Sequence, residues 1–183
     1  MAYTERIQIL IDSKINDLYS PPSFTLEERR FYFALNDREA KVANSIRNRS
    51  HRCFFVALQG YFKSRPVVLS PSFGDVEEDL CFIAQEQLPG PGIRRLSLDQ
   101  KQKDRFYQRI FDLLNYQKWS GTQDRSALIT HFQKIAKSWI EPRYLFDAST
   151  EYLSLCRIAI PKYTVMKQSW GLQKRCRRWL GTT

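Results

Sequence analysis

The stretch SHRCFFVALQGYFK, residues 50–63, decides the fold of this chain. Six consecutive residues within it, from Cys53 to Leu58, are apolar, so the element that they form has no side suited to solvent. Periodicity alone does not separate a buried helix from a buried strand. The length of the stretch and its helical neighbours favour a helix, with Ser50 as its N-cap. The stretch therefore predicts a central, buried helix.

The segments on either side of this stretch carry the periodicity and end signals of further helices. Before it, Thr25 and Asn36 each stand three residues ahead of a glutamate, which is the spacing of a capping box. An earlier helix is expected over residues 4–19. After it, helices are expected over residues 75–88, from a cap at Ser97, after a turn at 120–122, from Pro142 to about residue 156, and from a cap at Thr164 to about residue 180. No alternation is long enough for a sheet, so the sequence predicts an all-α fold.

The strongest break in the pattern is the run PGPG at residues 89–92, and the charge changes at the same place. Residues 1–90 hold 11 basic and 12 acidic residues, whereas residues 91–183 hold 18 basic and 7 acidic ones. We therefore expect two helical subdomains, 1–90 and 91–183. The chain has a net charge of +10, and residues 40–74 and 152–183 contain six and seven bases without an acid. Basic segments interleaved with aromatic residues point to an anionic partner, most simply nucleic acid.

The sequence gives no sign of an active site or a cofactor. Glycine-rich phosphate loops and the motifs of zinc proteases and serine hydrolases are absent, and the two histidines, His51 and His131, lie among basic residues. The acids at 75–79 suit the first turn of a helix better than a metal site. The four cysteines lack zinc-finger spacing, so we expect reduced thiols in a cytoplasmic protein. No apolar run approaches the roughly 18–20 residues that span a bilayer.

Five segments of the chain carry a family resemblance. They are IDSKINDLYSPPSFTLEERRFYFALND (11–37), IRNRSHRCFFVALQGYFKSRPVVL (46–69), EEDLCFIAQEQL (77–88), QKDRFYQRIFDLLNYQKW (102–119) and EPRYLFDASTEYLSLCRIAIPKYTVMKQSW (141–170). In this order they resemble the N-terminal region of transposases of the Tn-three family, the replicative DDE transposases that form cointegrates. In the fourth segment, Asn115 stands where the family has glycine.

The resemblance implies that this chain is the N-terminal part of a longer transposase and binds the terminal inverted repeats of the transposon. It also implies that the DDE carboxylates and their magnesium ions lie in a separate domain, so the chain alone is not an enzyme and holds no cofactor. The expected partners are double-stranded DNA at the transposon ends, the remainder of the transposase and, by self-association, a second copy. No membrane partner is expected.

Most of the expected DNA contacts fall into three groups, and Lys63, Arg65, Lys134 and Lys137 are expected in addition. A helix start near Ser50, surrounded by arginines, can bind phosphate through its free amides. Bases at four-residue spacing on the helix after Ser97 can follow the DNA backbone. The last two helices, joined by a turn that ends near Pro161, predict a helix-turn-helix-like element whose Lys167 and Gln168 face base edges. The expected DNA-binding residues are Arg47, Asn48, Arg49, Ser50, His51, Arg52, Lys63, Arg65, Lys101, Arg105, Arg109, Lys134, Lys137, Lys162, Tyr163, Thr164, Lys167, Gln168, Lys174, Arg175 and Arg178.

Three other interpretations stay open on the sequence alone. The basic stripes can be solvated helix faces, and residues 47–52 can be an ordinary capped helix start with solvated arginines. A helical adaptor that contacts another protein would expose an apolar patch and would bind with little dependence on salt. An RNA-binding module would favour single-stranded or loop substrates.

Overall fold

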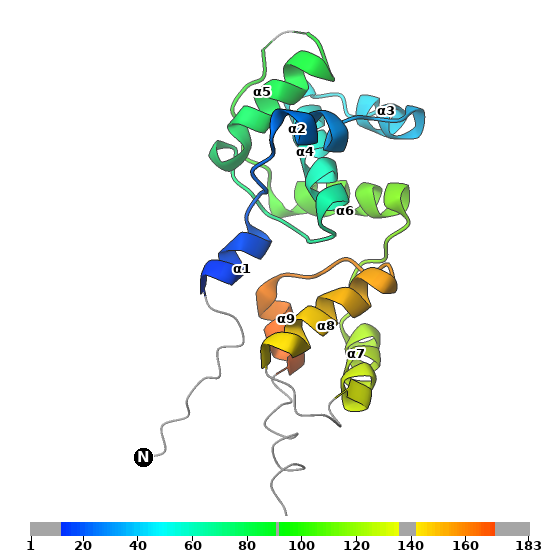
Figure 1. The fold of residues 1–183 in the computed structure, drawn as a ribbon. Helices are drawn as coiled ribbons and strands as arrows, with labels where there is room; N and C mark the ends of the chain where they lie inside the picture. Colours follow the sequence, from blue (N-terminus) through cyan, green and yellow to red (C-terminus); the bar gives the residue numbers. More distant parts are fainter. Residues whose placement is uncertain (1–11, 91, 136–141, 171–183) are drawn as a thin grey trace, which may run out of the picture.

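The computed structural model describes residues 12–90, 92–135 and 142–170 of the 183-residue chain. Within these ranges the regular structure is helical, which confirms the all-α fold class (Figure 1). No helix in this part of the chain is long and apolar enough to cross a membrane. The helices are α1 (Asp12–Tyr19), α2 (Leu26–Tyr32), α3 (Asp37–Asn44), α4 (Arg49–Ser64), α5 (Glu77–Glu86), α6 (Gln100–Leu114), α7 (Thr122–Ile135), α8 (Pro142–Leu155) and α9 (Tyr163–Trp170), with a 3-10 helix over Gly74–Val76.

Helix α4 lies at the centre of the helices α2, α3, α5 and α6, as its sequence predicts. These helices form the upper part of the view in Figure 1, and we call them the upper helices. Every residue from Cys53 to Phe62 is buried, and α2, α3, α5 and α6 all pack against it. Gly60 permits the closest of these approaches, because a Cβ there would overlap the ring of Phe33 at the end of α2. The predicted helix is confirmed, and its burial on every side follows from its continuous apolar run.

Two of the predicted N-caps are confirmed, and three fall at other residues. The capping boxes of Thr25 with Glu28 and of Asn36 with Glu39 are both formed. The cap of α4 is Asn48, whose Oδ1 accepts the His51 amide at 3.1 Å, so the predicted cap at Ser50 is wrong.

The cap of α6 is Asp99 with Gln102, two residues after the predicted pair of Ser97 and Gln100. Both pairs have the spacing of a capping box, and serine and aspartate cap about equally well, so the sequence offered two starts for this helix. Helix α9 begins at Tyr163, which places Thr164 inside the first turn and not at the cap.

The helices α7 to α9 are attached to the upper helices through a short extended segment. Residues 157–160 run between two other parts of the chain, with isolated bridges from Ile160 to Val67 and from Ile158 to Gln117. The Ile160 amide donates to the Pro66 carbonyl at 2.7 Å, and the Gln117 amide donates to the Arg157 carbonyl at 2.7 Å. Single bridges of this kind are the β-structure of the described residues.

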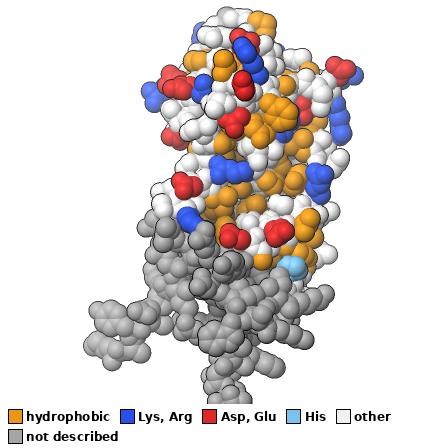
Figure 2. Space-filling model, viewed as in Figure 1, with side chains coloured by type: hydrophobic (Ala, Val, Ile, Leu, Met, Phe, Trp, Pro, Cys, Tyr) orange, Lys and Arg blue, Asp and Glu red, His pale blue; other side chains and the backbone are white. Residues whose placement is uncertain are grey.

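The hydrophobic core continues across the predicted boundary at residues 89–92. Phe55 of α4 and Phe106 of α6 lie in one buried cluster with Ile160 and Met166. The two phenylalanine rings stand edge to face with centroids 5.6 Å apart. Figure 2 shows hydrophobic side chains reaching the surface between charged groups of both signs in the middle of the visible face. The division of the chain into 1–90 and 91–183 stays a prediction, and the core packs residues of both parts together.

The connection from α8 to α9 spans residues 156–162, seven residues in all. A helix-turn-helix motif joins its helices through a turn of three or four residues. The connection lies where the sequence predicted it, but it is longer than this turn and carries the extended segment that pairs with residues 66–68 and 117. The helix-turn-helix-like role of α8 and α9 stays a prediction.

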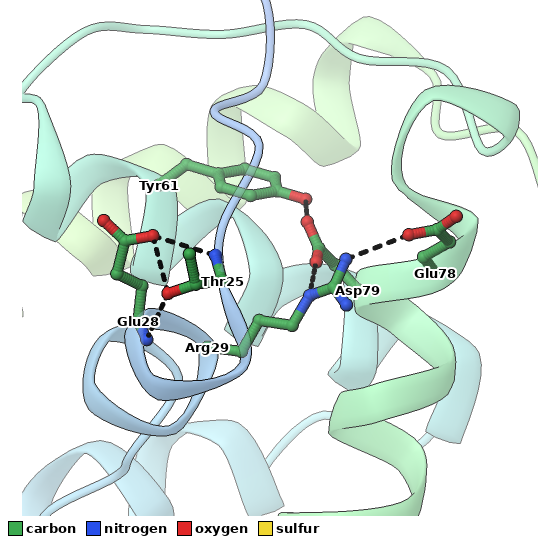
Figure 3. Close-up of polar contacts among 6 residues, drawn as sticks. All are labelled: Thr25, Glu28, Arg29, Tyr61, Glu78 and Asp79. Atoms are coloured by element: carbon green, nitrogen blue, oxygen red, sulfur yellow. Dashed lines mark hydrogen bonds and ion pairs between the residues drawn. The ribbon is translucent and has the colours of Figure 1, made fainter.

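An ionic network centred on the buried carboxylate of Asp79 joins α2 to α5 and contacts α4 (Figure 3). Arg29 Nε donates to Asp79 Oδ1 at 2.7 Å, and its Nη2 donates to Glu78 at 3.1 Å. The Tyr61 hydroxyl of α4 donates to Asp79 Oδ2 at 2.5 Å. Burial, and then this bond to a carboxylate, raise the pKa of Tyr61 above its ordinary value. Asp79 therefore has a structural role, because both of its carboxylate oxygens accept hydrogen bonds within the protein. Within the described ranges, no group of His, Cys, Asp and Glu side chains is placed to hold a metal ion.

Helix α6 ends at Asn115, where the sequence differs from the transposases that it resembles, and the backbone there is left-handed. Asn115 ends α6 with φ 56° and ψ 46°, a conformation that glycine adopts without strain and that asparagine tolerates better than other residues. The backbone at this position therefore favours glycine or asparagine over other residues.

We expect Asn115→Val to lower the free energy of unfolding by about 1–2 kcal/mol, because a branched side chain is strained at positive φ. Asn115→Gly should stay close to the wild type. Lys118→Val is the control, since Lys118 is exposed and has no left-handed backbone. Chemical denaturation measures all three, and equal losses at positions 115 and 118 would contradict the interpretation.

Candidate nucleic-acid interface

Four of the cations predicted to bind DNA donate to backbone carbonyls at or near the ends of helices. Arg49 Nη2 bonds the carbonyls of Ala84 and Leu88, at 2.9 Å and 2.6 Å, where α5 ends. Arg52 donates to the Ile46 carbonyl from Nε and Nη2, at 3.2 Å and 3.0 Å, just beyond the end of α3.

Lys63 and Arg65 act in the same way at two further helix ends. Lys63 Nζ bonds the Ala34 carbonyl just after α2, at 2.9 Å, and forms an ion pair with the buried carboxylate of Glu39, also at 2.9 Å. Arg65 donates to the carbonyls of Asp17 and Ser20 at the end of α1, at 2.5 Å and 3.0 Å.

These contacts have a common physical cause. The last carbonyls of a helix lack partners within it and carry the negative end of the helix dipole. A cation nearby supplies both hydrogen bonds and opposite charge. Arg38, which the sequence analysis did not single out, does the same for the Asp112 carbonyl in the last turn of α6. The donors of these side chains are engaged within the protein, which gives them a structural role that sequence spacing does not reveal.

A second set of predicted cations is exposed, and it gathers on and beside α6. Arg47, Lys101, Arg105 and Arg109 are all exposed. Arg109 Nη1 donates to the hydroxyl of Ser45, at 3.2 Å, in the turn between α3 and α4. His51, in the first turn of α4, stands edge to face with Phe106 of α6, with ring centroids 6.3 Å apart.

The structure thus places the start of α4 and the stripe on α6 side by side, although about 50 residues separate them in sequence. We call the surface of Arg47, His51, Lys101, Arg105 and Arg109 the α6 face. Its positive charge is diluted, because Asp104 and Asp112 are exposed on the same helix. Gln100 and Gln108 each bond one of these carboxylates, at 2.9 Å and 3.1 Å.

Three further basic residues, which were not predicted to bind DNA, lie just before α6 and in its first turn. Arg94 and Arg95 are exposed in the connection before α6, and Lys103 is half-buried in the first turn of α6. The Arg94 amide donates to the Ser50 hydroxyl at 2.9 Å, which fixes this connection against the start of α4. Arg94 and Arg95 stand two residues after the PGPG run, and this position was the signal in the sequence that could have identified them.

The expected contacts of the C-terminal group are described only in part. Lys162 and Thr164 are exposed, and Tyr163 is half-buried with its ring 6.4 Å from that of Tyr19. Arg157, which was not predicted, is exposed and lies 5.3 Å from the centroid of the Tyr116 ring. Lys134, Lys167 and Gln168 belong to described helices, but their side chains lie outside the described part. Lys137, Lys174, Arg175 and Arg178 lie outside the described residues.

Replacement by alanine should affect the stability of the protein differently in the two sets of cations. Arg52→Ala should lower the free energy of unfolding by about 1–2 kcal/mol, because it removes charged hydrogen bonds to the end of α3. Arg105→Ala should change it by less than about 0.5 kcal/mol, because Arg105 is exposed. Urea denaturation compares the two variants, and a loss at Arg105 equal to that at Arg52 would show that the two sets do not differ.

Comparison with known proteins gives one match. A family model described as a domain of unknown function, DUF4158, matches residues 9–170. No curated protein and no solved structure matched the chain. The matched residues run from the helix α1 to the end of α9 and cover well over half of the sequence. This chain therefore belongs to the DUF4158 family.

Proposed function

We propose that this chain is the N-terminal, DNA-binding part of a transposase and that it binds the terminal inverted repeats of its transposon as double-stranded DNA. The observation that carries the proposal is the α6 face, where cations from two distant parts of the chain lie together. The resemblance of five ordered segments to the Tn-three transposases supplies the biological context. Membership of the DUF4158 family is compatible with this function but does not identify it.

The α6 face suits the DNA backbone better than base edges. Cations at every fourth residue of a helix recur about every 6 Å along its axis. Duplex DNA carries one negative charge per about 1.7 Å of its axis, so a stripe of this kind meets phosphates wherever it lies along the strand. Arg47 and His51 would widen the contact to the side of α6. We therefore assign positioning, and not sequence readout, to this face.

Sequence readout requires a helix that can enter the major groove. Helix α4 does not qualify beyond its first turn, because Cys53 to Phe62 are buried. Helix α9 is the better candidate, since Lys167 and Gln168 lie in its first two turns. Glutamine can bond adenine through two hydrogen bonds, and lysine can bond guanine. Strand cleavage and its metal ions we assign to the separate catalytic domain that the resemblance implies.

One observation favours the alternative function, a helical adaptor that contacts protein. Among the residues that the structure describes, three large apolar side chains are exposed, Leu26 and Phe31 of α2 at 53% and 75% and Leu155 of α8 at 78%. Single exposed apolar residues are common on protein surfaces, so we rank this function second.

Titration of labelled duplexes at two salt concentrations tests the proposal. The substitutions Lys101→Ala and Arg105→Ala together should weaken binding to the transposon end and to a scrambled duplex alike. They should also flatten the slope of log affinity against log salt by about two. A matched control, Arg30→Ala with Lys118→Ala, removes two other exposed cations and should change binding less. If the wild-type protein binds neither duplex, or binds without salt dependence, the proposed function is wrong and the adaptor is favoured.

Gln168→Ala separates readout from positioning in the same assay. We expect roughly tenfold weaker binding to the transposon end and little change for the scrambled duplex, because a bidentate base contact contributes about 1–3 kcal/mol of discrimination. Equal losses for the two duplexes, or no loss for either, would show that α9 does not read the sequence.

A further inference from the structure

A pocket of about 280 Å³ opens between the loop before α5 and the start of α6. Its apolar wall includes Phe54 of α4 and Phe73, both buried. Its polar lining has three hydroxyls, those of Ser70, Ser72 and Ser97, from the two loops that precede α5 and α6. Phe54 lies one turn beyond Ser50, whose hydroxyl accepts the Arg94 amide at 2.9 Å, so the pocket lies next to the start of α4.

The two charged residues that line the pocket are both basic. Arg95 reaches it from the connection before α6, and Lys103 from the first turn of α6. Neither side chain has an ion pair or hydrogen bond within the described ranges. The next acids along the chain are Asp75, Asp99 and Asp104. Asp75 and Asp99 accept the amides of Ser72 and Gln102 at 2.7 Å and 2.6 Å, and Asp104 accepts the Gln100 side chain at 2.9 Å. These acids offset part of the positive charge, but their bonds hold them in the local turns.

This lining suits a phosphate ester. Guanidinium, ammonium and hydroxyl groups donate to phosphate oxygens, and the charged donors form the stronger bonds. The aromatic wall suits the carbon part of the same molecule. The volume lies just below the range of ordinary small-molecule sites, so the occupant is small.

We propose that this pocket holds one nucleotide unit of the bound DNA strand. The phosphate lies between Arg95 and Lys103, and the sugar lies against Phe54 and Phe73. The proposal rests on the function proposed above and adds a second point of attachment to it. A free nucleotide shares this chemistry, so the test includes both sources of the phosphate.

Two kinds of variant test the pocket without changing the α6 face. Arg95→Gln with Lys103→Gln removes both charges and keeps polar side chains of similar length. Gly74→Glu places a carboxylate in the lining, and Gly74→Gln is its neutral control of nearly equal size. A Cβ at Gly74 would meet nothing closer than the Ser72 hydroxyl at 4.0 Å, so both side chains can be accommodated. The thermal midpoint of each variant verifies that it folds.

We expect the charge-removing pair and Gly74→Glu to weaken duplex binding by about tenfold, with Gly74→Gln close to the wild type. The pair should also lower the salt slope by about one, because the two side chains share one phosphate. If both kinds of variant bind like the wild type, while Lys101→Ala with Arg105→Ala is weakened, the pocket inference is wrong and the proposed function stands.

A second experiment adds a free deoxynucleotide 5′-monophosphate and follows the backbone amide resonances of Ser72 and Ser97 by NMR. Shifts in the wild type that are lost in Gly74→Glu would support nucleotide binding in the pocket. If the wild type binds no duplex, the proposed function fails, and these shifts alone decide the pocket. Their absence as well would overturn the inference.

Discussion

The burial of α4 on every side is the constraint on which the rest of the described fold depends. Its ten buried residues leave no face for solvent, so α2, α3, α5 and α6 must cover it. Gly60 shows how closely they pack, because even one added carbon would meet the Phe33 ring. Two polar side chains are buried with them, those of Gln59 and Tyr61, and Asp79 with Arg29 satisfies the Tyr61 hydroxyl between α2 and α5 (Figure 3). A helix in this position serves as a scaffold, and only its first turn can face a ligand.

Short helices around one buried helix create many helix ends, and each end presents carbonyls that need partners. Arginine and lysine side chains from α4 and the residues after it supply those partners for α1, α2, α3 and α5. The basic composition of this chain therefore serves two purposes. One part of it closes helix ends, and another part, on and beside α6, remains at the surface for an anionic partner.

Local signals in the sequence predicted local structure well. The apolar run at 53–58 indicated the buried helix, and the capping boxes at Thr25 and Asn36 formed as their spacing predicts. The start of α6 was misplaced because overlapping Ser-x-x-Gln and Asp-x-x-Gln patterns both fit a cap. Contacts between distant residues left no local signal: the pairing of 157–160 with 66–68, the closing of α5 by Arg49, and the approach of Arg109 to Ser45. The candidate site shares this limit, since its cations were visible in the sequence but their grouping was not.

Amide hydrogen exchange, measured with and without the transposon-end duplex, tests the account most directly. In the free protein, residues 53–62 should exchange most slowly, because opening them requires loss of the whole core. The duplex should slow exchange at residues 45–51 and 94–109 and leave α2 and α5 unchanged. Fast exchange of residues 53–62 in the free protein, or protection by DNA confined to α2 and α5, would contradict the account.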